Sequence, residues 1–204
     1  MKNILAGSLL AMSLCGCAHK TTFQMVKPLP AISLENIKDA TLPAEFSDKD
    51  FDWMGGNLRL TVYSEDLYDA VQISQLKVGD TIVYDGKPIV AKKIENKNKY
   101  LVINDGIEEG GAELTANQGG IYRGSQMDDH STYTKVGQVQ LPLTENFTII
   151  DCGENPTDPS DTIRTAQKLY LENLKDYKRQ FNCLDTRVRV ENGMITNITR
   201  HWIP

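Results

Sequence analysis

The residues of this chain that could do chemistry are few, and the densest group among them is Asp128-Asp129-His130. Two carboxylates and an imidazole can ligate a divalent cation or form an acid–base pair. Three adjacent residues on one loop rarely converge on a single ion without a ligand from elsewhere. Asp128, Asp129 and His130 are therefore candidates for a metal or catalytic site, and a solvated polar loop is the favoured interpretation.

A second acidic group consists of Asp105, Glu108, Glu109 and Glu113, which are interspersed with Gly106, Gly110 and Gly111. Carboxylates and glycines can build a calcium loop, because calcium takes six to eight oxygen ligands. The spacing matches no EF-hand pattern, so the sequence predicts an acidic, glycine-rich hairpin instead.

Histidine is scarce, since only His19, His130 and His201 occur in the chain. A Ser-His-Asp or Cys-His arrangement would have to use one of the last two. The Gly-x-Ser-x-Gly elbow, His-Glu-x-x-His, the P-loop and the dinucleotide-binding Gly-x-Gly-x-x-Gly are all absent. The sequence therefore predicts no cofactor and leans away from an enzyme, without deciding the question.

Two aromatic residues, Phe51 and Trp53, precede Gly55-Gly56. Exposed aromatics would form a recognition patch for a partner or a glycan. The favoured interpretation is that they fill the core where the domain begins.

The start of the chain has the pattern of a secretory signal. Lys2 precedes the apolar run from Ile4 to Leu14, which Leu14-Cys15-Gly16-Cys17 closes. An apolar run of about eleven residues is too short to span a bilayer, which takes roughly twenty. The Leu-x-Gly-Cys ending resembles the lipobox of bacterial lipoproteins.

This resemblance implies that residues 1–16 are a signal peptide and that Cys17 becomes the acylated N-terminus. The alternative is an ordinary signal peptide without a lipid. Position 18 is Ala rather than Asp, which in Gram-negative lipoproteins favours the outer membrane over the inner one. We therefore expect a protein of the bacterial cell envelope, held on the membrane by its N-terminal lipid.

Without Lys2 the mature chain has 21 basic and 27 acidic residues, a balance that argues against nucleic acid and against anionic lipid surfaces as partners, because both call for basic patches. Cys152 and Cys183 then remain as a pair in a compartment that permits disulfides. A disulfide between them and two separately buried thiols both stay open.

The chain divides into a signal peptide (1–16), a proline-containing tether (17–48) and a single mainly β ectodomain (49–204). Alternating apolar and polar residues, as in Leu58-Arg59-Leu60-Thr61-Val62, predict strands. Asp85-Gly86 and other turn pairs separate these strands at short intervals. They predict an antiparallel sheet, either a sandwich or a small barrel.

One helix is expected from about Pro159 to Phe181, with Asp158 as its N-cap. Its apolar residues recur every three or four positions, so it would pack on the sheet. The predicted fold is therefore α+β, mainly β, with one long helix and a final hairpin around Asn192-Gly193.

These features favour a lipid-anchored envelope protein acting as a non-catalytic binding or scaffolding module for another envelope protein or a surface ligand. The alternative is an envelope hydrolase or metal-dependent enzyme that uses the Asp128-Asp129-His130 loop. A ligand-carrying or inhibitory barrel is a third possibility, and fold alone does not choose among the three.

Overall fold

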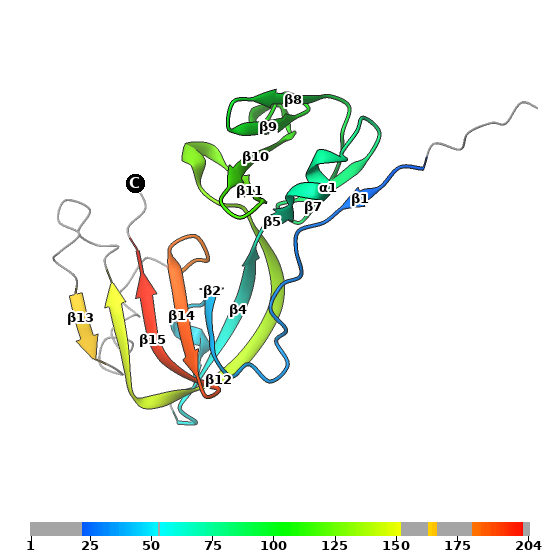
Figure 1. The fold of residues 1–204 in the computed structure, drawn as a ribbon. Helices are drawn as coiled ribbons and strands as arrows, with labels where there is room; N and C mark the ends of the chain where they lie inside the picture. Colours follow the sequence, from blue (N-terminus) through cyan, green and yellow to red (C-terminus); the bar gives the residue numbers. More distant parts are fainter. Residues whose placement is uncertain (1–21, 53, 152–162, 167–180, 202–204) are drawn as a thin grey trace, which may run out of the picture.

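A computed structural model of the chain describes residues 22–52, 54–151, 163–166 and 181–201. These residues form two parts, a barrel and a second group of strands inserted into it (Figure 1). Each part has its own cluster of buried apolar side chains.

The barrel consists of five strands that close on themselves. Around it the pairing order is β4-β12-β15-β14-β2 and back to β4. Only the β12–β15 pair is parallel. The strands β2, β4 and β12 follow one another in the barrel, and the next strand, β14, returns to lie beside β2, which is the order of a Greek key. A five-stranded Greek-key barrel is the architecture of the OB-fold. The strands are β2 (Ala40–Glu45), β4 (Asn57–Glu65), β12 (Tyr133–Asp151), β14 (Thr186–Glu191) and β15 (Met194–Arg200).

Alternation of side chains builds the barrel core. Leu58, Leu60 and Val62 of β4 are fully buried on one face, as a period of two requires. Within this core, Phe46 stacks on Phe181 with ring centroids 4.5 Å apart. Of the two structures that the sequence leaves open, the sandwich and the small barrel, the barrel is present.

Strand β12 closes the barrel because it bends. Its first half pairs with β4 and its second half with β15. The register shifts between Lys135 and Gly137 and again between Leu143 and Thr148. Such bulges bend a strand and increase its twist, which lets one 19-residue strand pair on both of its sides.

The inserted subdomain spans residues 66–132, between β4 and β12. It contains an antiparallel five-stranded sheet of order β5-β11-β10-β9-β8 and the β6–β7 hairpin, to which β1 (Met25–Val26) of the N-terminal segment adds a third strand. Its elements are β5 (Leu67–Asp69), α1 (Ala70–Ser74), β6 (Thr81–Tyr84), β7 (Lys87–Val90), β8 (Ile94–Lys97), β9 (Tyr100–Ile103), β10 (Ala112–Asn117) and β11 (Ile121–Ser125), with 3₁₀ turns η2 (Ile107–Glu109) and η3 (Met127–Asp129).

The N-terminal segment joins the two parts. Strand β1 (Met25–Val26) pairs in parallel with β6 of the inserted subdomain, and the Leu29 N–H donates to the Leu67 carbonyl at 2.6 Å. The chain then enters the barrel as β2. The range 17–48, expected to be a tether, thus contributes a strand to each part.

The predicted α+β fold with a long helix from about Pro159 to Phe181 is wrong. Within that range Ile163–Ala166 form β13, antiparallel to β12, and Phe181 makes a β-bridge with Phe46. Residues 159–162 and 167–180 lie outside the described residues. β13 is an edge strand that pairs with β12 on one side, and its β-branched Ile and Thr suit a strand. Among the described residues, the single α-helix is the five-residue α1.

Two short elements complete the barrel sheet. The 3₁₀ turn η1 (Asp48–Asp50) leads into β3 (Phe51–Asp52), which pairs with β4. The ring of Phe51 is buried and meets Phe46 edge-on, with ring centroids 5.7 Å apart. The interpretation of Phe51 as a core residue is confirmed, and Trp53 lies outside the described residues.

Candidate functional site

The two acidic groups singled out in the sequence line one cavity of about 690 Å³. The hairpin between β9 and β10 supplies one group, and η3 supplies the other. The carboxylates on its wall are those of Asp105, Glu108, Glu109, Glu113, Asp128 and Asp129. This acidic cavity would attract cationic groups by its excess of negative charge.

One carboxylate of the acidic cavity is held in place. Asp129 Oδ1 lies 2.7 Å from Arg123 Nη2 and accepts a 3.2 Å hydrogen bond from the Thr115 hydroxyl. Arg123 also donates to the Ser131 hydroxyl, which itself donates to Glu65 at the end of β4. A polar network therefore connects the acidic cavity to the barrel.

The structure does not bring the predicted catalytic or metal triplet together. Asp128 and Asp129 line the acidic cavity, whereas His130 is not among the residues on its wall. Asp128 and Asp129 both have positive φ, near 58° and 59°, so the chain turns sharply before His130. Within the described ranges, no group of three or more His, Cys, Asp or Glu side chains could hold a metal ion. The enzyme alternative stays a prediction.

A second cavity, which the sequence did not reveal, lies where the N-terminal segment passes between the barrel and the inserted subdomain. We call it the junction cavity, and its volume is about 510 Å³. Its wall is mainly apolar and comes from the N-terminal segment, the β6–β7 hairpin and the strands β4 and β12. The lining residues are Met25, Lys27, Pro28, Leu29, Pro30, Ala31, Ser64, Asp66, Val83, Gly86, Pro88, Thr134, Lys135 and Val136.

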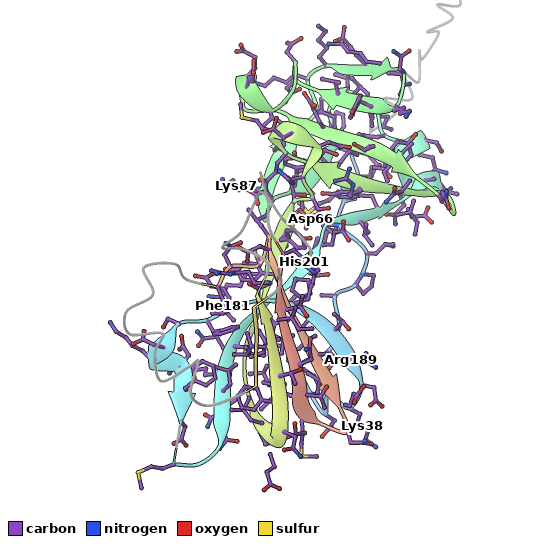
Figure 2. All side chains as sticks on the ribbon, turned by 90° about the vertical axis from the view of Figure 1, so that its left-hand side faces the viewer. Lys38, Asp66, Lys87, Phe181, Arg189 and His201 are labelled. Carbon is purple, nitrogen blue, oxygen red and sulfur yellow. The ribbon has the colours of Figure 1, made fainter. Side chains whose placement is uncertain are left out.

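Among the described residues on the wall of the junction cavity, Asp66 is the one carboxylate, and it is fully buried. Figure 2 shows it at the waist between the barrel and the inserted subdomain. Its carboxylate accepts hydrogen bonds from the Asp85 N–H at 2.9 Å and from the hydroxyls of Thr132 and Thr134 at 3.0 and 2.7 Å. Burial nevertheless raises the pKa of Asp66 above its usual value of 3.8, because desolvation disfavours the charged form.

Sequence reasoning missed the junction cavity because its wall comes from segments far apart in the chain. Pro28 and Pro30 indicated a stiff spacer, and only the pairing of β1 with β6 places them against the inserted subdomain. A usable signal was the short apolar stretch from Phe23 to Ile32, which a solvated tether does not need.

The remaining predicted site residues are placed as follows. Cys17 and Cys152 lie outside the described residues, so the lipid anchor and the disulfide stay predictions. Cys183 is half-buried, and burial raises the pKa of its thiol to about 11, which keeps it protonated and poorly nucleophilic at neutral pH. His201 is exposed, and its N–H donates to the Asp185 carbonyl.

Comparison of the chain with protein-family models, with curated proteins and with solved structures finds no match. In the part of the chain that the structure describes, no helix has the length and apolar character needed to cross a bilayer.

Proposed function

We propose that this protein is a lipid-anchored component of the bacterial cell envelope that acts as a non-catalytic binding module. The anchor rests on the resemblance of Leu14-Cys15-Gly16-Cys17 to a lipobox. The binding role rests on the junction cavity, which is the single observation that carries it. Ligand sites are typically concave, mostly apolar and supplied with a few fixed polar groups, and the junction cavity has these properties.

The polar groups of the junction cavity suggest the chemistry of its occupant. Lys27 and Lys135 are exposed on its wall, whereas its carboxylate, Asp66, already accepts three hydrogen bonds. Leu29 presents an apolar side chain that is 37% exposed. The expected occupant is an apolar segment of another envelope protein with acidic residues beside it.

A photo-crosslinking experiment in the protein's own cells tests this proposal. A photo-reactive amino acid replaces Leu29 in the full chain, and the matched control replaces Met194, which is 40% exposed and outside the cavity. We expect an adduct with one envelope protein at position 29 only, mapped by mass spectrometry to an apolar segment with neighbouring acidic residues.

Lys135 provides the second readout. Changing Lys135→Glu should lower the adduct at position 29 several-fold, whereas Lys38→Glu at the far end of the barrel (Figure 2) should not. No adduct at position 29, equal adducts at both positions, or an adduct with a small molecule alone would contradict the proposed partner. An N-terminal peptide without acyl groups on Cys17 would contradict the anchor.

A further inference from the structure

The N-terminal chain is held against the inserted subdomain from its first described residues. The Gln24 N–H donates to Asp80 Oδ1 at 2.9 Å, and the Thr81 N–H donates to the Gln24 carbonyl at 2.9 Å. The ring of Phe23 covers Gly79 so closely that a Cβ added at Gly79 would overlap the ring. The chain is therefore part of the folded domain from residue 23 onward.

Apolar side chains are exposed where the chain joins this subdomain. Met25, Thr81 and Val90 pair in one row across the sheet β1-β6-β7. The next row buries Val26 and Ile82 in the core, so Met25 and Val90 lie on the opposite, outward face, because successive side chains of a strand alternate.

We call this surface the N-terminal face, and its apolar members are Phe23, Met25, Val78 and Val90. Each of the four is at least 50% exposed. Val78 belongs to it because it precedes Gly79, whose N–H donates to the Ala91 carbonyl next to Val90. Exposed apolar groups gathered on one surface mark an interaction site.

Basic residues accompany the N-terminal face. Lys27 and Lys77, which stand next to Val26 and Val78 in the sequence, are both exposed, although the whole chain has a formal charge of −5. The acidic cavity belongs to β9, β10 and the turns beside them, at the opposite side of the inserted subdomain from β1 (Figure 1). Apolar groups with lysines beside them suit an anionic lipid surface.

Chain length places this face beside the membrane. Six residue steps separate Cys17 from Phe23, and whatever their conformation they reach at most about 22 Å. We propose that the N-terminal face lies on the lipid bilayer, so that the inserted subdomain rests on the membrane surface and the barrel points away from it. This inference rests on the acylation of Cys17 in the proposed function.

The test uses the full lipidated chain, purified from membranes and reconstituted in vesicles of phosphatidylethanolamine and phosphatidylglycerol that carry an alkyne-tagged lipid. A photo-reactive amino acid replaces Val78 or Val90, and the control replaces Met194, which neighbours the Gly193 bonded to Lys38 at the far end of the barrel. We expect tagged-lipid adducts at positions 78 and 90 and none at position 194.

Charge reversal supplies an independent readout on the same vesicles. Lys27→Glu with Lys77→Glu should lower the lipid adduct at position 78 several-fold, and Lys38→Glu should leave it unchanged. Acylated protein with equal or no lipid adducts at positions 78 and 194, or with adducts only to a second copy of the chain, overturns the inference. Protein lacking acyl groups on Cys17 instead overturns the anchor, so the two failures are distinguishable by mass spectrometry.

Discussion

Asp66 shows how one residue joins the two parts of this molecule. It lies between β4 and β5, and its donors come from the β6–β7 turn (Asp85), from the residue before β12 (Thr132) and from β12 itself (Thr134). Its own N–H donates to the Thr132 carbonyl, and its carbonyl accepts from the Gly124 N–H. A single fully buried side chain thus links the barrel to the inserted subdomain.

We predict that Asp66→Asn folds with unchanged or greater stability at neutral pH. The amide oxygen can accept from the Asp85 N–H and the Thr132 hydroxyl, and the amide NH₂ can donate to the Thr134 hydroxyl oxygen. The pKa of Asp66 is raised in the folded state above its usual 3.8. The free energy of unfolding of the wild-type protein therefore falls as pH rises from 3.8 through the raised pKa, because the folded protein must give up a proton that it holds more tightly than the unfolded chain. The Asn side chain does not titrate. The free energy of unfolding of the variant should therefore rise relative to that of wild type as pH increases across this window.

Urea unfolding at several pH values measures this difference. Asp66→Ala is the control, because it leaves the buried Thr132 hydroxyl without its acceptor and should lower the free energy of unfolding by about 2 kcal/mol or more. A difference between the Asn variant and wild type that falls with rising pH would show that the ionised form is the favoured one.

Among the elements, the β14–β15 hairpin agrees most closely with its sequence. Asn192 and Gly193 have φ of 52° and 79°, as a type I′ turn requires. The turn sets Val190 opposite Ile195. Continued without a break, that register would set Val188 opposite Asn197, and this poor pairing predicts a bulge or a half-exposed face. The register does shift, between Arg189 and Val190, and Val188 pairs with Ile198 instead.

We predict different responses at the two turn positions. Gly193→Ala adds a Cβ at a positive φ and should lower the free energy of unfolding by about 1 kcal/mol. Asn192→Gly keeps the backbone N–H that donates to Asp39 and should be neutral within a few tenths of a kcal/mol. Thermal and urea unfolding measure both variants. An equal loss of stability in the two would contradict the positive φ of the type I′ turn as the cause of the loss in Gly193→Ala.

At the scale of the whole molecule, the inserted subdomain leaves and re-enters the barrel at one place. Glu65 and Tyr133, at the ends of β4 and β12, are direct partners in the antiparallel pair. The two buried clusters are separate, so the barrel core does not need side chains from residues 66–132.

We predict that replacing residues 66–132 by Asn-Gly leaves a folded barrel. A two-residue type I′ turn connects directly paired residues of an antiparallel hairpin. The shortened chain should unfold in one cooperative transition by circular dichroism, at a lower free energy than the full chain because smaller domains bury a smaller fraction of their surface. A gradual, non-cooperative loss of signal would mean that the barrel depends on the inserted subdomain.

The sequence by itself determined features that depend on near neighbours: alternating strands, glycine turns, the final hairpin and its bulge. Turn backbone angles and strand periodicity act over a few residues, so they can be predicted from local spacing. The long helix failed for the complementary reason. Its apolar spacing predicted a helix around Ile163, but pairing with β12, residues distant in the chain, makes Ile163–Ala166 a strand.

Only the tertiary structure decided where the candidate sites lie. The acidic residues around positions 105–113 and 128–129 were recognised separately, and the packing of the β9–β10 hairpin beside η3 makes them one cavity. The junction cavity and the N-terminal face depend on β1 pairing with β6 across more than fifty residues. Such contacts depend on which elements bury their apolar faces against one another. A local pattern of residue types does not determine which elements these are.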